Sequence, residues 1–431
     1  MKKKRIDLIS LGCSKNLVDS ERLLKQLTDC GFEAYHDADE VKGKIVVINT
    51  CGFIGDAKEE SINTILKFAE AKNNGDVEKL YVMGCLSERY REELQQEIPE
   101  IDKLYGKFDW TDLTHDLINS YPSTLPYERI LTTPKHYTYI KISEGCNRFC
   151  AFCAIPLITG RHKSRPIDEI LSEVKDLVSK GVKEFNIIAQ DLSSYGLDLS
   201  NEMMLPELID RMAQIEGVEW IRLHYAYPAQ FPYGVLDVMA KHKNVCKYLD
   251  IALQHINDNV LKNMLRHVDK KKTLDLIHTI REKVPGIHIR TTLMVGFPGE
   301  DEEAYNELVD FVKEVKFERM GAFAYCEEED TYAAKNYEDA IPSDVKTDRL
   351  NKLMDVQEQI SLDLNESKVG KTFRVIIDKE DKEFYIGRTE FDSPEVDPEV
   401  LIEKTQKLEI GEFYNVEITE ALPFELFAKP L

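Results

Sequence analysis

The chain is 431 residues long, and its 43% hydrophobic and 31% charged residues are typical of a folded globular protein rather than a disordered one. The net charge of −22 argues against a protein whose main task is to bind nucleic-acid phosphates, and it favours a basic partner. No apolar run approaches the roughly 18 residues of a membrane span. The basic N-terminus lacks a secretory cleavage site, so we expect a cytoplasmic protein.

The N-terminal part, residues 1–120, alternates short apolar runs with helix-like segments. The runs IDLISLG, KIVVINT and KLYVMG are each followed by a loop and an amphipathic segment. Continuous apolar strands that alternate with helices predict a parallel sheet covered on both faces. The proline-containing stretch that follows, residues 121–136, is predicted to be a linker.

The alternation continues over residues 137–340 with six strand-like runs: TYIKIS, EFNIIAQ, WIRLHYAY, KYLDIALQ, HIRTTLMVG and RMGAFAY. Six strand–helix units predict a partial barrel, because a full eight-unit barrel takes about 250 residues. A connecting helix is expected at 341–365. Residues 366–431 show period-two alternation, which predicts a small antiparallel β-barrel. The fold class is therefore α/β with a C-terminal β module.

Three of the nine cysteines lie in the stretch EGCNRFCAFC, directly after the first barrel strand. Cys146, Cys150 and Cys153 offer three thiolates, the usual ligands of iron–sulfur clusters, and would leave one iron of a four-iron cluster open. Structural zinc is the alternative, but it normally needs four protein ligands. We therefore favour an iron–sulfur cluster here.

Three further cysteines, Cys13, Cys51 and Cys85, each follow an apolar strand and precede a helix. Ligands of open parallel sheets bind at the carboxyl ends of the strands, so these thiols are expected along one edge. The alternative is three separate buried cysteines. Their equivalent positions favour a second, auxiliary cluster, with Asn16 and Asn49 as hydrogen-bonding neighbours or as turn residues.

The remaining cysteines are predicted to play no part in either cluster. Cys30 and Cys246 are interpreted as structural. Cys326 lies in the acidic loop AYCEEED, where it could approach a substrate but is interpreted as incidental.

The CxxxCxxC spacing at the first strand of the barrel resembles the radical S-adenosylmethionine superfamily. The resemblance implies S-adenosylmethionine on the open iron, and loops at the carboxyl ends of the strands that contact it. The predicted cofactor contacts are Gln190, Asp191, Arg222, Gly296 and Gly299. The alternative for Arg222 is an ordinary ion pair, and for the glycines an ordinary loop.

Along its whole length the chain resembles the methylthiotransferases, a family with an N-terminal cysteine domain, a radical barrel and a TRAM-like module. SLGCSKNLVDSE and ISEGCNRFCAFCAIPLITGRHKSRP carry the resemblance, supported by QDLSSYG, RLHYAYP, YLDIALQH and MVGFPGE. Two departures are Ala252, where the family commonly has proline, and the acidic loop at Cys326–Glu327. They put local loop shape in doubt, but not the chemistry.

The resemblance implies two 4Fe–4S clusters, held by the two cysteine sets, and a sulfur-containing group transfer. One S-adenosylmethionine would methylate a sulfur on the auxiliary cluster, and the radical derived from a second would activate a C–H bond. The cofactors carry this chemistry, so no acid–base catalytic residue is expected. An electron donor such as flavodoxin or ferredoxin is implied.

The opening motif is most like the methylthiotransferases that modify the β-carbon of an aspartate in ribosomal small-subunit protein S-twelve. The alternatives are a tRNA adenosine methylthiotransferase and a non-catalytic iron–sulfur protein of the ribosome. Residues 366–431 contain 16 acidic and 9 basic residues, which favours a basic protein over tRNA. The acidic stretch predicts five substrate-binding residues: Glu390, Asp392, Glu395, Asp397 and Glu399.

Overall fold

The computed structural model describes residues 4–38, 42–118 and 127–431. The chain divides into two compact units, each of which is described by itself. The first contains Met1–Thr133, Tyr139–Asn147 and Cys153–Glu173, and the second contains Pro134–Thr138, Arg148–Phe152 and Val174–Leu431. These two units do not coincide with the predicted domains, whose boundaries were placed at residues 120 and 137. The predicted linker lies partly outside the described residues.

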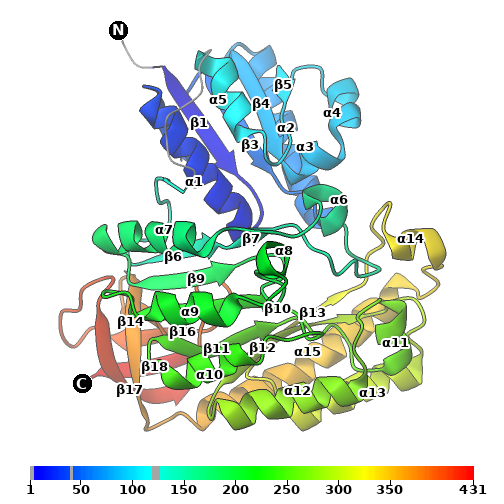
Figure 1. The fold of residues 1–431 in the computed structure, drawn as a ribbon, viewed down its shortest axis with the longest axis vertical. Coiled ribbons are helices and arrows are strands. Elements are labelled where there is room, and N and C mark those ends of the chain that lie inside the picture. Colours follow the sequence, from blue (N-terminus) through cyan, green and yellow to red (C-terminus); the bar gives the residue numbers. More distant parts are fainter. Residues whose placement is uncertain (1–3, 39–41, 119–126) are drawn as a thin grey trace. The chain divides into compact units, whose positions relative to one another are not determined.

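The first unit is built on a parallel sheet with the strand order β2-β1-β3-β4-β5 (Figure 1). Buried side chains alternate along β3, so that Val46 and Ile48 face one core and Ile45 and Val47 face the other. Helix α2 covers the first core and α1 covers the second. The covered parallel sheet is as predicted. Its elements are β1 (Arg5–Ser10), α1 (Ser14–Asp29), β2 (Glu33–His36), β3 (Ile45–Thr50), α2 (Gly55–Asn73), β4 (Lys79–Gly84), α3 (Cys85–Arg89), α4 (Arg91–Glu97), β5 (Lys103–Leu104) and α5 (Trp110–Ile118).

A six-stranded sheet with the order β13-β12-β11-β10-β9-β6 follows, and the strand pairs β9–β10, β10–β11, β11–β12 and β12–β13 are parallel. All six predicted strands are present. They are β6 (Tyr137–Lys141), β9 (Glu184–Ile188), β10 (Trp220–Ala226), β11 (Val245–Ile251), β12 (His288–Val295) and β13 (Arg319–Ala324). Two short strands, β7 (Ser143–Glu144) and β8 (Lys163–Ser164), form a separate ladder.

Helices connect the strands of this sheet and cover it. Helix α10 packs against α9 and α12, and α15 packs against α13 and β13 (Figure 1). The helices are α6 (Ile155–Thr159), α7 (Ile167–Ser179), α8 (Leu197–Ser200), α9 (Leu205–Ala213), α10 (Gly234–Lys241), α11 (Asp258–Asn263), α12 (Lys270–Lys283), α13 (Glu302–Val315), α14 (Tyr332–Asn336) and α15 (Ser343–Glu366). Within the described ranges, none of the helices combines the length and apolar character that crossing a membrane requires.

The last five strands form a closed barrel in the order β14-β15-β16-β18-β17. The small antiparallel barrel is present as predicted, and one parallel pair, β16 with β18, closes it. Alternate residues fill its core, among them Val375 and Ile377 of β14. Its strands are β14 (Thr372–Glu380), β15 (Phe384–Thr389), β16 (Glu399–Glu403), β17 (Phe413–Ala421) and β18 (Glu425–Pro430).

The small barrel packs on the six-stranded sheet within the second unit. Ile376, on the outside of β14, joins a buried cluster with Trp220, Cys246 and Tyr248, residues of β10 and β11. The ring of Phe413 lies edge-on to Trp220 at 4.8 Å between centroids. Cys246 is therefore a packing residue, as predicted.

Candidate functional site: two sets of three cysteines

The dispersed cysteines lie at the carboxyl ends of three neighbouring strands of the first unit. Cys13 is the residue that precedes α1, Cys51 follows β3, and Cys85 begins α3 directly after β4. Cys13 is exposed, whereas Cys51 and Cys85 are buried. This is the shared edge that the strand order predicts, because β1, β3 and β4 are adjacent in the sheet.

Glycines let the cysteine loops approach each other. Gly12 has a φ of +90°, and a Cβ there would lie 2.9 Å from Cys51 Sγ. A Cβ at Gly52 would lie 2.7 Å from the backbone nitrogen of Leu86, next to Cys85. A side chain at either glycine would therefore push the loops apart.

Asn16 and Asn49 connect these loops through hydrogen bonds. Asn16 Nδ2 donates to the backbone oxygens of Leu11 and Thr50, at 3.1 and 2.9 Å, and Asn49 Nδ2 donates to the Asn16 backbone oxygen at 3.0 Å. The remaining side-chain atom, Asn16 Oδ1, lies 3.6 Å from Cys85 Sγ. Asn16 thus borders the thiols directly, whereas Asn49 acts by holding Asn16.

Lys107 is a neighbour of these thiols that the sequence did not indicate. Its Nζ donates to Asn16 Oδ1 at 3.2 Å and lies 3.3 Å from Asp19 Oδ2. Burial raises the pKa of the Cys85 thiol to about 11, and the positive charge of Lys107 acts in the opposite direction. The site therefore contains a buried cation that favours thiolates.

The compact cysteine set lies in the loop that follows β7. Gly145 has a φ of +71°, and a Cβ there would lie 2.1 Å from the Arg161 backbone oxygen, so the turn before Cys146 requires glycine. The Cys146 backbone nitrogen donates to the Gly160 oxygen at 3.2 Å. In the second unit, the Ala151 nitrogen donates to the Met264 oxygen at 2.9 Å, which holds the segment that carries Cys150.

Arg266 and Tyr227 contact Cys150, and Arg148 lies on the same tyrosine ring. Arg266 Nη1 donates to Cys150 Sγ at 3.2 Å, and Tyr227 Oη lies 3.8 Å from the same sulfur. The guanidinium groups of Arg148 and Arg266 lie 4.3 and 4.2 Å from the Tyr227 ring centroid, within the range of cation–π attraction. The sequence did not single out either residue: Tyr227 lies in the block RLHYAYP without an assigned role, and Arg266 belongs to no local pattern.

Asp191 lies near this group and is bound within the chain. The predicted cofactor contact is buried, and its Oδ2 accepts from Arg148 Nε at 2.7 Å and from Ser194 Oγ at 2.5 Å. Its Oδ1 accepts from the Ser193 backbone nitrogen at 2.8 Å. Asp191 therefore anchors the arginine of the cysteine motif. Gln190, half-buried after β9, remains a candidate for cofactor contact.

Arg222, which was predicted to lie beside the cofactor carboxylate, is bound within the chain. This fully buried side chain comes from the third residue of β10, and its Nε donates to Glu184 Oε1 at 3.1 Å. Its Nη1 donates to the Glu390 backbone oxygen at 2.6 Å. The guanidinium thus points to the small barrel at the amino-terminal end of the strands, and the ion-pair alternative applies.

The two candidate glycines are explained by packing within the protein. Gly296 has a φ of +73°, and a Cβ there would lie 2.4 Å from Lys346 Cγ on α15. Gly299 has a φ of +93°, and a Cβ there would lie 2.7 Å from Asn263 Nδ2. Close approach does require glycine at both positions, but the neighbour is a side chain of the chain itself rather than an adenine.

The acidic stretch of the small barrel is used largely for internal ion pairs, contrary to its predicted role in substrate binding. Asp392 is buried and accepts from Arg319 Nη2 at 2.5 Å, and Asp397, with its side chain 3% exposed, pairs with Arg290 at 3.2 Å. Glu390 Oε2 accepts from the Lys247 backbone nitrogen at 3.1 Å. These carboxylates hold the small barrel on the six-stranded sheet.

The last two acidic residues of that stretch remain accessible. Glu395 is exposed, although its Oε1 accepts from Tyr137 Oη at 3.1 Å. The Glu399 side chain is 44% exposed and pairs with Lys379 at 2.8 Å. These two carboxylates therefore remain candidates for contact with a partner protein.

Both cysteine sets fit iron–sulfur clusters by their donor chemistry. Each set supplies three thiols, which are the ligands that such clusters take. In the part of the chain that the structure describes, no three His, Cys, Asp or Glu side chains converge as the ligands of a single metal ion would. A four-iron cluster takes each thiolate at a different iron, so its ligands surround it instead of meeting at one point.

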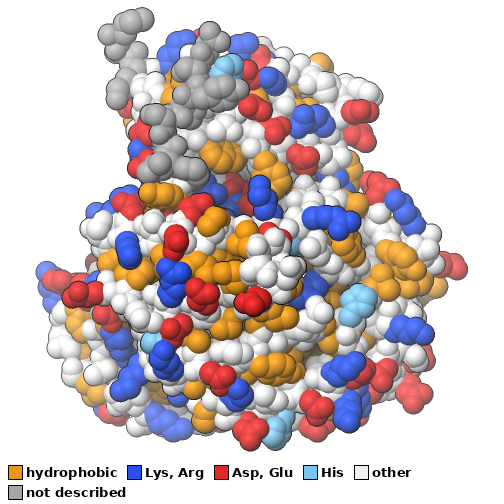
Figure 2. Space-filling model, in the orientation of Figure 1, with side chains coloured by type: hydrophobic (Ala, Val, Ile, Leu, Met, Phe, Trp, Pro, Cys, Tyr) orange, Lys and Arg blue, Asp and Glu red, His pale blue; other side chains and the backbone are white. Residues whose placement is uncertain are grey.

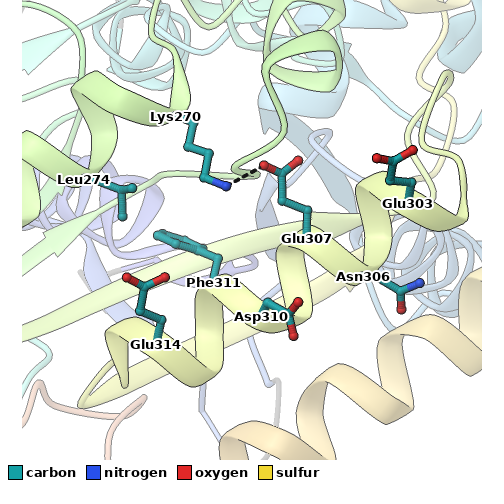
Figure 3. Close-up of a pocket in the computed structure, with 8 residues that line it drawn as sticks. All are labelled: Lys270, Leu274, Glu303, Asn306, Glu307, Asp310, Phe311 and Glu314. Carbon is teal, nitrogen blue, oxygen red and sulfur yellow. Dashed lines mark hydrogen bonds and ion pairs between the residues drawn. The ribbon is translucent and has the colours of Figure 1, made fainter.

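A cavity of about 410 Å³ lies apart from the cysteines, along α13 (Figure 3). Figure 3 shows Glu303, Glu307, Asp310 and Glu314 along this helix, with Lys270 paired to Glu307 at 2.7 Å. Three of these carboxylates are exposed, and Glu307 is half-buried. The cavity contains no thiol, so it is a surface feature rather than part of either cysteine set.

Three family models match consecutive parts of the chain. Residues 5–106 match a family described as "Uncharacterized protein family UPF0004", residues 140–312 match the radical SAM superfamily, and residues 369–431 match the TRAM domain. The chain is similar over 77% of its length to the solved radical S-adenosylmethionine methyltransferase TsrM from Kitasatospora setae (TM-score 0.57, 14% identity, 77% of that chain). It is also similar to OxsB (TM-score 0.53, 13% identity, 83% of this chain and 56% of that one). At these identities the two structures show the fold alone.

The sheet, the cysteine loop and the matching models together define a radical S-adenosylmethionine enzyme. Among curated relatives, the "Ribosomal protein uS12 methylthiotransferase RimO" of Bacteroides thetaiotaomicron is 62% identical, over 100% of this chain and 99% of the relative. Proteins of the same name from Phocaeicola vulgatus and Porphyromonas gingivalis are 62% and 57% identical, over 100% of this chain and 100% and 99% of the relatives. The chain belongs to the RimO family of radical methylthiotransferases.

Proposed function

We propose that this chain transfers a methylthio group to the β-carbon of an aspartate in ribosomal small-subunit protein S-twelve. The observation that carries the proposal is the identity of 62% with relatives named as uS12 methylthiotransferases, over the whole length of the chain. The acidic module gives less support to the choice of a basic substrate than its sequence does, because three of its five candidate carboxylates hold the small barrel on the six-stranded sheet. Acidic and basic side chains are interspersed on the face of the second unit in Figure 2.

Two 4Fe–4S clusters and S-adenosylmethionine are part of this proposal. The clusters would be held by Cys13, Cys51 and Cys85 and by Cys146, Cys150 and Cys153, and with the bound cofactor they would supply the sulfur and the radical. The chain itself supports the second set through Arg266 and Tyr227, which contact the Cys150 sulfur. Gln190 remains the proposed contact to the cofactor, and Glu395 and Glu399 the proposed contacts to the substrate.

The electron donor is proposed to be a flavodoxin or ferredoxin, and tRNA is not expected as a direct substrate. A ribosomal-protein substrate also places the enzyme in the cytoplasm. Mass spectrometry of protein S-twelve from a strain that lacks this gene should show the unmodified aspartate. If the modification persists while a tRNA digest loses its methylthioadenosine, the tRNA alternative replaces the proposal.

Iron content and two substitutions separate an enzyme with two clusters from its alternatives. Anaerobically purified protein should contain about eight irons per chain, whereas about four would remove the auxiliary cluster. Cys146→Ala should abolish cleavage of S-adenosylmethionine to 5′-deoxyadenosine. Cys51→Ala should leave cleavage intact and block sulfur insertion. Reconstituted protein that yields no deoxyadenosine on reduction would favour a non-catalytic iron–sulfur protein.

A further inference from the structure

Lys107 is a buried cation beside the dispersed cysteines. Its side chain is 2% exposed and lies in the segment between β5 and α5. Its Nζ lies 3.2 Å from Asn16 Oδ1, the same oxygen atom that lies 3.6 Å from Cys85 Sγ. A single amide oxygen therefore bridges the ammonium group and the thiol.

The carboxylate that faces Lys107 does not balance its charge alone. Asp19 pairs with Lys107 at 3.3 Å and also with the buried Lys141, so one carboxylate is shared by two ammonium groups. Lys141 reaches a second carboxylate, Glu144, whose side chain is 21% exposed. Two carboxylates thus face two ammonium groups, and Lys107 in addition shares Asn16 Oδ1 with Cys85 Sγ, where a further negative group would lie near its charge.

The three dispersed cysteines provide that group when they are deprotonated. Lys107 Nζ and Cys85 Sγ share Asn16 Oδ1, at 3.2 and 3.6 Å, and Cys13 and Cys51 lie at the same edge of the sheet as Cys85. A cluster with three thiolate ligands carries this negative charge in permanent form, because a ligating thiol is deprotonated.

We propose that Lys107 is a positioning residue that balances the charge of the cluster held by Cys13, Cys51 and Cys85, and that it raises the reduction potential of this cluster. Net charge and local electrostatics set the potentials of iron–sulfur clusters. A fixed positive charge in a buried site stabilises the reduced form, which is the more negative one. Asp19 opposes this effect, because its carboxylate neutralises part of the Lys107 charge. The inference rests on the auxiliary cluster of the proposed function.

The test isolates the auxiliary cluster in a full-length parent in which Cys146, Cys150 and Cys153 are all replaced by Ala. Each variant is purified anaerobically, its iron is counted, and the cluster is titrated with reductant while its electron paramagnetic resonance signal is followed. At the potential where half of the cluster is reduced in the parent, the reduced fraction of the cluster in Lys107→Met should be about one tenth or less. Asp19→Asn should shift the reduced fraction upwards, in the opposite direction.

Two further variants serve as controls. Lys107→Arg keeps the charge and should remain close to the parent. Lys103→Met removes an exposed lysine four positions away, whose side chain is 53% exposed and pairs with Asp116 at the surface, and it should leave the potential unchanged.

The outcomes separate this inference from the proposed function. A parent without iron overturns both the auxiliary cluster and the role of Lys107. The role of Lys107 alone is overturned if the parent holds about four irons but Lys107→Met leaves the reduction potential unchanged. It is also overturned if Asp19→Asn shifts the potential in the same direction as Lys107→Met. If Lys107→Met does not retain iron, Lys107→Gln and Lys107→Arg decide: iron kept only by Arg supports charge balance, and iron lost from both overturns it.

Discussion

Arg266 donates a hydrogen bond to the sulfur of Cys150 at 3.2 Å, although 116 residues separate the two in the chain. The same guanidinium group donates to the Ala252 backbone oxygen and lies against the ring of Tyr227. One arginine thus connects the cysteine loop with the end of β11 and the loop after β10. The departure from the family pattern at Ala252 is therefore compatible with the site, because the contact uses a backbone atom.

Replacing Arg266 should impair the reductive step. Arg266→Met removes a charged hydrogen bond to the Cys150 sulfur, and hydrogen bonds of this kind are worth about 1.5–3 kcal/mol. The initial rate of 5′-deoxyadenosine formation under limiting reductant should fall about tenfold or more. Arg266→Lys should recover part of the loss. Arg211→Met, which removes an exposed arginine paired with Glu207, should have no effect. An unchanged rate in Arg266→Met with full iron content would show that the bond is dispensable.

The buried ion pair between Arg319 and Asp392 should matter far more than the exposed pair of the same barrel. Asp392→Ala leaves the Arg319 guanidinium, with its side chain 5% exposed, without its carboxylate, and breaking a buried pair costs about 3–5 kcal/mol. Glu399→Ala removes an exposed carboxylate and should cost less than about 1 kcal/mol. Urea unfolding of the two variants measures the difference. Equal losses would contradict the internal role assigned to the acidic stretch.

The stability of the protein should fall in acid through Asp378. Burial acts to raise the pKa of this carboxyl group, but Arg388 and His136 outweigh it and hold the pKa at about 2 instead of 3.8. The group therefore stabilises the fold fully above about pH 4, and this contribution is lost as the pH falls from about 4 to about 2. The loss amounts to about 2 kcal/mol.

Urea unfolding at several pH values tests this prediction. Asp378→Asn should lower the stability at pH 7 and flatten its dependence between about pH 4 and pH 2. Glu184 and Asp392 also have pKa values below the ordinary range, because nearby charges outweigh burial. These two groups add to the pH dependence of both proteins, so the wild type should show the steeper dependence of stability on pH. Parallel pH curves for the wild type and Asp378→Asn would refute the assignment.

Two glycines distinguish backbone strain from close packing. Gly286 and Gly296 both have positive φ, +79° and +73°, but only Gly296 has a neighbour within reach of a Cβ. Gly286→Ala should cost about 1–2 kcal/mol through strain alone. Gly296→Ala should cost about 1–3 kcal/mol more, because its Cβ collides with Lys346. Urea unfolding compares the two. Loss of S-adenosylmethionine binding by Gly296→Ala without loss of stability would instead favour the adenine contact.

The main strands were predictable because burial on both faces makes them continuously apolar. The missed strands lack that signal. Strand β5 has two residues, and β2 has four and lies at the edge of its sheet, where half of its residues are exposed. Strand β16 lies in the acidic stretch, so its inward-facing Val400 and Ile402 are hidden among carboxylates. Strand order and the parallel closure by β18 depend on contacts between distant segments, which a local pattern does not contain.

The six candidate ligands could be predicted because their positions follow from strand ends and motif spacing. Asn16 was also predicted beside the dispersed set, but the basic neighbours of the cysteines could not be predicted. Lys107 and Arg266 are single basic residues whose burial and contacts are set by distant parts of the chain. Arg222 is a residue for which the sequence suggested a cofactor contact that its position does not favour. A strand residue can lie near either end of the barrel, and Arg222 lies near the amino-terminal end of β10.

The long-range contacts of two arginines between the six-stranded sheet and the small barrel also have a consequence for the order in which these parts fold. Arg388 pairs with Glu184, 204 residues away, and Arg222 donates to the Glu390 backbone oxygen, 168 residues away, whereas the hairpins of the small barrel join strands that are close in the chain. Contacts between distant residues form late, because the loop they close must first lose its conformational freedom. The small barrel should therefore assemble early from its own hairpins. The small barrel should dock on the six-stranded sheet last, in a step that desolvates the charged side chains of both surfaces. Added salt weakens the attraction between these charges, so the docking step should become slower.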